Sequence, residues 1–284
     1  MKIQWYPGHM TKARREMQQN MKLVDLVIEI IDARIPVSSR NPDIDELANG
    51  KLRLVILNKA DLADPASNER WEAYFKEKGI ASVLTDARNT ANVRKISKKI
   101  EEVSREKVER DRKKGIQNRR IRAMVVGIPN VGKSTLINSF AGKSSAKTGN
   151  KPGVTKGTQW IRLNEQADLL DTPGMLWPKF EDETVGEHLA LIGSINDEIV
   201  DQTELALVLI RSLEEIKSGF LSERCEYTAE NTTIEILEAY GRSRGCLVRG
   251  GNVDPDRAAI LLMTDYRSGK LGRYTLEQPE DKKF

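Results

Sequence analysis

The sequence predicts an α/β fold with a mostly parallel sheet, followed by a smaller region built from helices alone. Two observations support this prediction. Short apolar runs rich in β-branched residues alternate with stretches of helical spacing as far as Trp177. Such uninterrupted apolar runs are typical of parallel strands that are covered on both faces. Beyond Trp177 the strand-like runs stop, while helical spacing continues.

Six apolar runs are the expected strands. A helical stretch at 71–78 lies before the third run and stops at Gly79, and another at 134–140 follows the fourth. The alternation of runs and helical stretches favours a parallel sheet, because parallel strands need crossover connections. The runs are residues 26–31, 52–57, 81–84, 121–126, 159–163 and 167–170.

The region after Trp177 shows helical spacing without a strong strand pattern. Its last helix is expected to follow the start signal Asp254-Pro255. We therefore divide the chain into an α/β domain at residues 1–178 and a helical domain at residues 179–284. The helical stretches are residues 203–213, 233–239 and 256–264.

Length and composition exclude several classes of protein. The 284 residues, 39% hydrophobic and 31% charged, are enough to bury a substantial core in one or two domains. No apolar run approaches the ~18 residues of a membrane span, and residues 1–9 lack the apolar core of a signal peptide. The two cysteines, Cys225 and Cys246, have no metal-like spacing. We expect a cytoplasmic protein in a reducing compartment, with no membrane partner.

Charge is unevenly distributed along the chain, although the net charge is only +4. Residues 88–122 hold 14 basic and 5 acidic residues, and residues 1–22 and 240–274 are also basic. Residues 179–228, by contrast, hold 4 basic and 12 acidic residues. The basic segments predict a phosphate-rich partner. The alternative for a run such as 105–110 is a solvated helix face with i,i+4 ion pairs.

The fourth apolar run leads into Gly127-Ile128-Pro129-Asn130-Val131-Gly132-Lys133-Ser134, which fits the phosphate-loop pattern G-x-x-x-x-G-K-[ST]. Its backbone N–H groups and the following helix N-terminus are suited to bind phosphates. Lys133 is expected to bridge the β- and γ-phosphates, and the Ser134 hydroxyl to bind Mg²⁺. The nucleotide contacts of this loop are expected from Asn130, Val131, Gly132, Lys133, Ser134 and Thr135.

The base is expected to bind Asn58-Lys59-Ala60-Asp61, which follows the second apolar run. A carboxylate at Asp61 accepts hydrogen bonds from the N1–H and the exocyclic amine of guanine. Adenine has no N1–H, and a buried unpaired charge costs ~1–3 kcal/mol or more. Asn58 would tie this loop to the phosphate loop, and the Lys59 stem would cover the base. The loop Thr85-Asp86-Ala87 is expected at the edge of the base.

A third loop, Asp171-Thr172-Pro173-Gly174, follows the last apolar run. D-x-x-G is common by chance, but its position two strands after the phosphate loop indicates a Mg²⁺-side switch. Asp171 would hold the metal through water, and the Gly174 N–H would sense the γ-phosphate. Between the two loops, Thr155 offers a hydroxyl that could complete the Mg²⁺ shell. Other threonines lie nearby, so the choice of Thr155 depends on motif resemblance.

These motifs resemble those of GTPases, but in a permuted order, because the base loop precedes the phosphate loop. The chain is similar to the circularly permuted GTPases. The starting segment Trp5-Tyr6-Pro7-Gly8-His9-Met10 and the segment Asp32-Ala33-Arg34-Ile35-Pro36 resemble, more narrowly, the bacterial ribosome biogenesis GTPase A family. The resemblance covers essentially the whole chain. It implies a P-loop GTPase domain, a role in late maturation of the large ribosomal subunit, and a helical domain that contacts rRNA.

The permuted order of the motifs has a mechanical consequence that does not depend on the family resemblance. The switch at Asp171–Gly174 leads through residues 175–178 directly into the helical domain. Ordering of this switch by the γ-phosphate can therefore move that domain. Our hypothesis is that GTP selects a ribosome-binding arrangement and that hydrolysis releases the protein.

Two residues concern hydrolysis. Many GTPases place a glutamine after the D-x-x-G glycine to orient the attacking water, but this chain has Met175. His9 is the better substitute of the two histidines, and the resemblance implies the same; the alternative is a surface histidine that contacts RNA. In GTPases with a similar phosphate loop, Asn130 corresponds to an asparagine that helps to bind K⁺. The alternative for Asn130 is a loop-bracing role.

The sequence therefore predicts an enzyme that hydrolyses GTP to GDP and phosphate, stimulated by a ribosomal particle. Its expected partners are GTP or GDP and the large-subunit precursor with its rRNA, and a monomer is expected. One alternative is an RNA-binding placeholder with little hydrolysis, which Met175 leaves open. Another is a GTPase that serves tRNA modification or membrane transport, against which stand the lack of a transmembrane segment and of a reactive cysteine or redox motif.

Overall fold

The computed structural model describes residues 9–86, 88–89, 91–116, 119–141, 159–177, 180 and 182–281. Contacts divide them into two compact units. The larger unit holds the described residues from 9 to 177 together with 277–281, and the helical unit holds those from 180 to 276. Within these described ranges, we find no helix with both the length and the apolar character to span a membrane.

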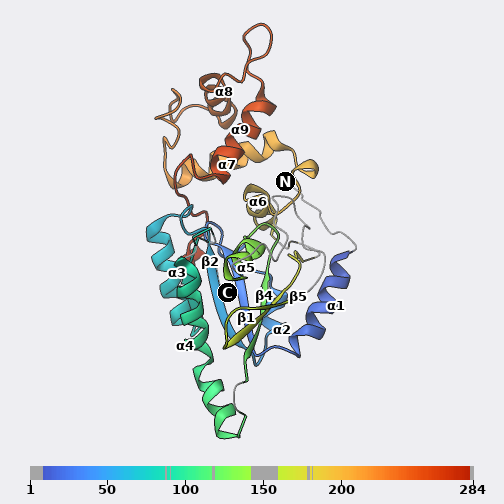
Figure 1. The fold of residues 1–284 in the computed structure, drawn as a ribbon. Helices are drawn as coiled ribbons and strands as arrows, with labels where there is room; N and C mark the ends of the chain where they lie inside the picture. The colour runs from blue at the N-terminus through green and yellow to red at the C-terminus, as the bar shows by residue number, and fades with distance from the viewer. Residues whose placement is uncertain are drawn as a thin grey trace. The chain divides into compact units, whose positions relative to one another are not determined.

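The larger unit is built on a six-stranded sheet (Figure 1). The strand order is β3-β2-β1-β4-β6-β5, and every neighbouring pair is parallel except β5 with β6. The mostly parallel sheet predicted from the sequence is confirmed. The strands are β1(Leu26–Asp32), β2(Leu52–Asn58), β3(Ala81–Leu84), β4(Ile121–Gly127), β5(Gln159–Arg162) and β6(Ala167–Asp171).

Helices cover both faces of this sheet. Met17 and Ile44 pack with Val27 of β1 on one face, and Trp71 packs with Ile31 of β1 farther along the same face. On the other face, α4 contacts β2 and β3, and α5 contacts β4 and β6. The helices of this unit are α1(His9–Met21), α2(Asp43–Leu47), α3(Pro65–Glu77), α4(Ala91–Lys113) and α5(Lys133–Ala141).

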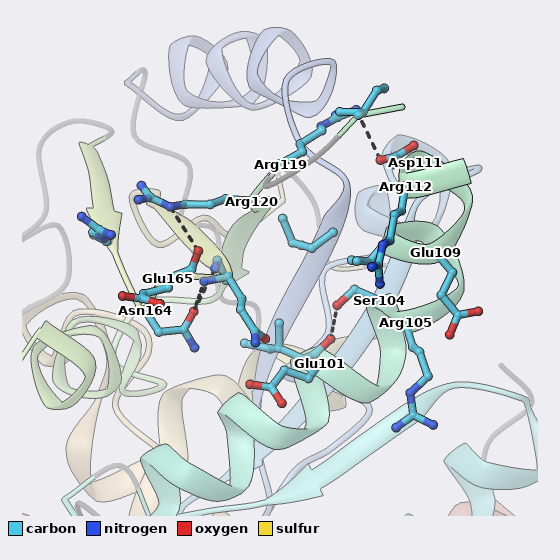
Figure 2. Close-up of a pocket in the computed structure, with 17 residues that line it drawn as sticks. Glu101, Ser104, Arg105, Glu109, Asp111, Arg112, Arg119, Arg120, Asn164 and Glu165 are labelled. Atoms are coloured by element: carbon cyan, nitrogen blue, oxygen red, sulfur yellow. Dashed lines mark hydrogen bonds and ion pairs between the residues drawn. The ribbon is translucent and has the colours of Figure 1, made fainter. Parts of the chain in front are cut away.

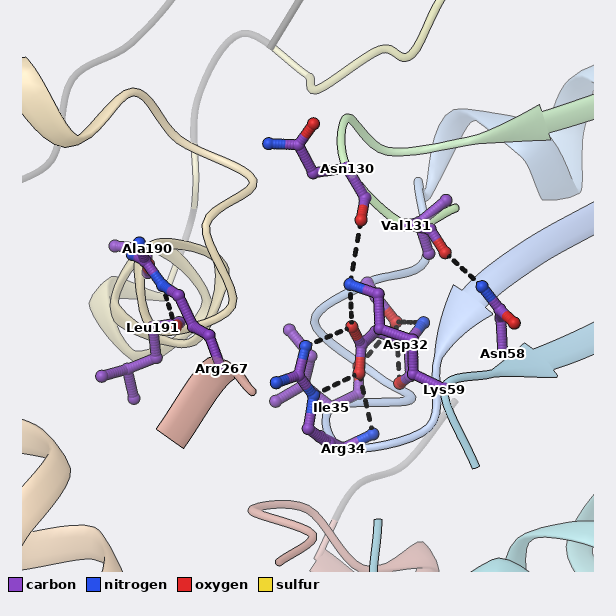
Figure 3. Close-up of polar contacts among 11 residues, drawn as sticks. Asp32, Arg34, Ile35, Asn58, Lys59, Asn130, Val131, Ala190, Leu191 and Arg267 are labelled. Carbon is purple, nitrogen blue, oxygen red and sulfur yellow. Dashed lines mark hydrogen bonds and ion pairs between the residues drawn. The ribbon is translucent and has the colours of Figure 1, made fainter. Parts of the chain in front are cut away.

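Polar caps set the helix starts in the helical unit. Asp254 accepts a hydrogen bond from Arg257 N at 3.1 Å, so the predicted start signal opens the last helix. Arg267 of that helix donates to the carbonyl oxygens of Ala190 and Leu191 at 2.8 and 3.0 Å, which joins the first and last helices (Figure 3). The helices are α6(Glu183–Leu191), α7(Gln202–Ile216), α8(Thr233–Ser243) and α9(Pro255–Arg267).

The chain returns to the larger unit at Glu277, whereas the sequence analysis places the whole tail with the helical domain. The Glu277 carboxylate accepts hydrogen bonds from Val37 N at 2.6 Å, from Ser38 N at 3.0 Å and from the Ser38 hydroxyl. Trp71 Nε1 donates to the Glu277 carbonyl oxygen at 3.0 Å. Only 2% of Glu277 is exposed. Long-range contacts of this kind have no local sequence pattern, so the sequence does not reveal them.

Replacing Glu277 with alanine is expected to lower the free energy of unfolding by ~2–4 kcal/mol. The N–H groups of the buried Ser38 and the half-buried Val37 would lose their acceptor, and each unsatisfied buried donor costs ~1–3 kcal/mol. Urea unfolding of the nucleotide-free protein measures the change. Glu280→Ala is the matched control, because Glu280 is exposed in the same short segment. Equal midpoints for the two variants would show that this contact adds no stability.

Candidate active site

Four strands end at one edge of the sheet in residues that carry the predicted motifs. Asp32, Asn58, Gly127 and Asp171 are the last residues of β1, β2, β4 and β6, which run parallel. The carboxyl ends of parallel strands form the crevice in which open α/β sheets bind ligands. The structure therefore brings the base loop, the phosphate loop and the switch loop together, although 113 residues separate Asn58 from Asp171 (171 − 58).

The phosphate loop has a backbone that tolerates few substitutions. A Cβ at Gly127 would lie 2.5 Å from the carbonyl oxygen of Ile30, so the strand end permits only glycine. Asn130 and Gly132 have φ angles of 57° and 101°, and the left-handed region that they occupy suits glycine and asparagine. Lys133 then begins α5, with Ser134 and Thr135 in its first turn. This loop-to-helix turn is the geometry that binds phosphate.

Lys133 and Asp171 form a buried pair of opposite charges behind this loop. Burial lowers the pKa of Lys133 to about 8, and the Asp171 charge opposes that change. Burial raises the pKa of Asp171, against the lowering effects of Lys133 and the Thr172 N–H. A bound phosphate would restore a full anionic partner to the lysine.

Asp171 fits a site for a divalent cation. Both of its carboxylate oxygens are buried and lack a hydrogen bond of normal geometry to the described residues. A buried carboxylate without partners is costly, and Mg²⁺ prefers carboxylate and hydroxyl oxygens. Ser134 supplies a hydroxyl at the start of α5. Thr155, the third expected ligand, lies outside the described residues.

The base loop is tied to the phosphate loop by two side chains (Figure 3). Asn58 Nδ2 donates to the Val131 carbonyl oxygen at 2.7 Å, and Asn58 Oδ1 accepts from Thr85 Oγ1 at 3.2 Å. Lys59 Nζ donates to the Asn130 carbonyl oxygen at 2.9 Å. Asn58 therefore makes the contact between the two loops that the sequence analysis expects of it. The Lys59 amine also binds the phosphate loop, a contact that the sequence analysis does not include.

Sequence reasoning gave Asp32 and Arg34 no role in the site, but they orient Lys59. Arg34 donates to both carboxylate oxygens of Asp32, at 2.9 and 2.7 Å, and Lys59 Nζ lies 2.9 Å from Asp32 Oδ2 (Figure 3). Asp32 is fully buried. Burial acts to raise its pKa, but the two cations outweigh burial and hold the pKa well below its usual range. Charged residues directly after an apolar strand were the signal that could have identified this cluster.

Asp61 has a cationic partner at the place expected for guanine. Arg88 NH2 lies 2.5 Å from Asp61 Oδ2, and Arg88 Nε lies 3.0 Å from Asp86 Oδ1. Burial acts to raise the pKa of Asp86, but the hydrogen bonds from Arg88 lower it overall. Arg88 therefore offsets the repulsion between the two carboxylates. Ala87 lies outside the described residues.

The switch loop packs closely on the phosphate loop. A Cβ at Gly174 would lie 2.9 Å from both Pro129 Cα and Pro129 N, and 3.0 Å from Lys133 Nζ. Met175 N donates to the Gly127 carbonyl oxygen at 3.2 Å, and the Met175 side chain is buried in the core. Met175 is therefore placed to anchor the switch and not to contact water.

Neither histidine has a described side chain in this site. His9 is the first residue of α1, but its side chain lies outside the described part of the chain. His188 is buried in α6 of the helical unit.

Changing Gly174 to alanine is expected to slow GTP hydrolysis by ~10–100-fold, because a misplacement of about 1 Å in an active site can cost that much. The added methyl group would press on the backbone of Pro129 and on Lys133 Nζ, so the two loops must separate. Single-turnover hydrolysis measures the effect. GDP affinity serves as the internal control, since GDP lacks the γ-phosphate that the sequence analysis expects Gly174 to contact. Hydrolysis at the wild-type rate would contradict the close packing.

Comparisons with known proteins agree with this geometry. The family described as "50S ribosome-binding GTPase" matches residues 122–240. A ribosome biogenesis GTPase A from Bacillus cereus is 48% identical, over 99% of this chain and 95% of its own length. The protein of the same name from Thermotoga maritima is 34% identical, over 98% of this chain and 95% of its own.

A solved structure is similar over nearly the whole chain. The crystal structure of GNP-bound YlqF from T. maritima superposes with a TM-score of 0.69 at 29% identity, and covers 95% of this chain and 99% of that one. GTPases of this kind generally use Mg²⁺, which agrees with the donors found at Asp171 and Ser134. The chain belongs to the ribosome biogenesis GTPase A family, and it is a GTP-hydrolysing factor of ribosome assembly.

Proposed function

We propose that the protein acts in late maturation of the large ribosomal subunit. It binds the precursor and its rRNA in the GTP state and leaves after hydrolysis. The names of its relatives and the description of its matching family support this proposal. So do the basic segments at residues 1–22, 88–122 and 240–274. We further propose that it works as a monomer in the cytoplasm.

Lys133 and the phosphate loop bind the triphosphate in this proposal. Lys133 neutralises the β- and γ-phosphates, and backbone N–H groups of the loop contact their oxygens. Mg²⁺, held by Ser134, Thr155 and water on Asp171, would neutralise charge that develops on the transferred phosphoryl group. The support is the Asp171 carboxylate, which is buried near Lys133 and has no hydrogen bond of normal geometry to a described residue. The phosphate contacts come from Asn130, Val131, Gly132, Lys133, Ser134, Thr135 and Gly174.

Guanine is read by Asp61. Its carboxylate accepts from N1–H and the exocyclic amine, while Arg88 shifts toward Asp86. Thr85, Asp86 and Ala87 bound the edge of the base, and Lys59 lies over it. Asn58 keeps this loop in register with the phosphate loop through Val131.

His9 positions the attacking water. The support is indirect. The Met175 side chain is buried in the core, so it cannot orient water as the glutamine of many GTPases does. A His9→Ala variant is expected to bind particles normally but to lose particle-stimulated turnover. Weaker particle binding with normal turnover per bound molecule would indicate instead that His9 contacts RNA.

Asn130 binds K⁺ beside the phosphates, where the cation would neutralise developing charge. The left-handed backbone of Asn130, at φ 57°, places this residue at the tight turn of the phosphate loop. GTP turnover is expected to be faster in K⁺ than in Na⁺ at equal ionic strength. Equal rates would leave Asn130 with a structural role.

Stimulated hydrolysis is the property that separates this function from its alternatives. GTP turnover is measured alone, with mature large subunits, with large-subunit precursors and with small subunits. We expect the precursors to give the largest stimulation. Tight binding without stimulation would favour an RNA-binding placeholder. Stimulation by tRNA alone would favour a GTPase of tRNA modification.

A further inference from the structure

The second half of α4 buries few side chains in the protein core. The buried residues of α4 are Ile96, Ile100 and Ser104, and no residue from 105 to 113 is buried. In Figure 1 this helix continues past the end of the sheet. At ~1.5 Å per residue, those nine residues extend about 13 Å beyond the last buried position. Ion pairs join this extension to the rest of the unit, with Lys107 Nζ 3.3 Å from Asp25 and Arg119 3.6 Å from Asp111.

The extension and the segment after it are strongly basic. Residues 105–122 contain nine lysines and arginines against three acidic residues. Arg110, Arg112 and Lys113 lie in the last turn of α4, where cations also complement the helix dipole. The helix dipole acts only within the last turn, so it does not account for the basic residues outside that turn.

A groove lies beside this extension (Figure 2). It is open to solvent and has a volume of about 880 Å³. It lies between the second half of α4, the turn between β5 and β6, and the residues Ile116 and 119–121. Its exposed apolar side chains include Val108 and Ile116, which are 44% and 42% exposed. Five arginines line it: Arg105, Arg112, Arg119, Arg120 and Arg162.

Two of these arginines have structural partners. Arg119 pairs with Asp25 at 3.0 Å and with Asp111 at 3.6 Å. Arg120 pairs with Asp168 at 3.5 Å and donates to the Glu165 carbonyl oxygen at 3.3 Å. Both therefore hold the groove walls in place.

The other three arginines are available to a ligand. Arg105, Arg112 and Arg162 are exposed, and no ion pair joins them to a described acidic residue. The exposed acids Glu101, Glu109 and Glu165 line the groove as well, and Lys113 and Lys114 follow Arg112 in the chain. Arg105 and Arg112 are seven residues apart, so they share one face of α4 at a spacing of about 10 Å.

We propose that this α4-end surface, defined by Arg105, Arg112 and Arg162, binds backbone phosphates of structured RNA. Arginine forks match phosphate geometry, and unpaired surface guanidinium groups are suited to exchange counterions for phosphates. The inference deepens the proposed function and depends on its RNA partner. It assigns a second RNA contact to the GTPase unit, in addition to the one expected in the helical unit.

This surface does not overlap the nucleotide site. The groove includes Ile121 and Ala167, the first residues of β4 and β6, whereas the nucleotide site lies at the last residues of those strands. The seven residues of β4 span about 20 Å at ~3.3 Å per residue. RNA and GTP can therefore bind at the same time, at opposite ends of the same strands.

The test compares Arg105→Gln/Arg112→Gln/Arg162→Gln with the control Arg70→Gln/Lys76→Gln/Lys78→Gln. The control removes three exposed charges at α3 and its C-terminal end, outside the three basic segments. Binding of the full chain to a labelled RNA hairpin is measured from about 50 to about 300 mM salt. Over this range the loss of affinity with salt reports how many phosphates the protein contacts. The arginine variant should bind at least ~10-fold more weakly, with a salt slope lower by about 2–3. The control should bind like the wild type, and basal GTP hydrolysis should be unchanged in both.

Each outcome has one interpretation. If the wild type binds the hairpin and the arginine variant matches it in affinity and slope, the surface is not an RNA contact. If the wild type binds no RNA, the RNA part of the proposed function fails together with this inference. If the arginine variant binds the hairpin normally but no longer sediments with ribosomal particles, the partner of this surface is a protein and the inference is overturned. Thermal melting confirms that the exposed substitutions leave the fold intact.

Discussion

Asp61→Asn is expected to weaken GTP binding by at least ~100-fold, because two hydrogen bonds to a charged acceptor contribute ~1.5–3 kcal/mol each. The asparagine amide would also direct a donor toward the N1–H and the amine of guanine. Xanthine carries a carbonyl where guanine carries that amine. The variant should therefore bind the xanthine nucleotide better than GTP, as titration with labelled nucleotides will show.

Asp86→Asn is the matched control for Asp61→Asn. Both changes remove one ion pair with Arg88, but only the first removes the base-reading carboxylate. An ion pair with an arginine that is 69% exposed contributes about 0–1 kcal/mol. Asp86→Asn should thus alter GTP affinity by only a few fold. Similar affinities for the two variants would mean that Asp61 does not read the base.

Lys133→Met is expected to reduce GTP hydrolysis by ~10²–10³-fold, the usual effect of removing one group that stabilises transition-state charge. The lysine is 7% exposed and lies beside Gly174 and Asp171. Methionine retains the length of the side chain and removes only the ammonium group. Single-turnover hydrolysis at saturating GTP separates this loss from weaker binding.

Two controls keep the Lys133 result interpretable. Lys76→Met makes the same chemical change at an exposed position of α3 and should leave hydrolysis unchanged. Because Lys133→Met leaves the buried Asp171 without its cation, unfolding in the absence of nucleotide must be measured as well. Near-normal hydrolysis by a folded Lys133→Met variant would remove Lys133 from the catalytic site.

The sheet and the site edge could be predicted because their signals are local. The apolar runs identify the strands, and polar residues at Asp32, Asn58 and Asp171 mark where those strands end. In a parallel sheet such ends meet at one edge, so the base loop, the phosphate loop and the switch loop could be expected there together. The permutation did not obscure this, since strand neighbours depend on the sheet and not on where the chain begins.

Several of the contacts that the sequence did not predict join positions far apart in the chain. Glu277 binds the backbone at Val37 and Ser38 from about 240 residues away, with no periodic pattern to indicate it. Arg88 was visible as a charge, but only the fold places it between Asp61 and Asp86. The sequence likewise did not show whether the charged residues at 105–113 bind a partner or only face solvent, because both cases give the same pattern.

We propose that the nucleotide state controls attachment to the large-subunit precursor. Sedimentation of the protein with purified precursor particles tests this control, with a non-hydrolysable GTP analogue, with GDP and without nucleotide. We predict that the protein sediments with the particles in the presence of the analogue and stays largely in the supernatant with GDP. Equal sedimentation in the GTP-analogue and GDP states would contradict the claim.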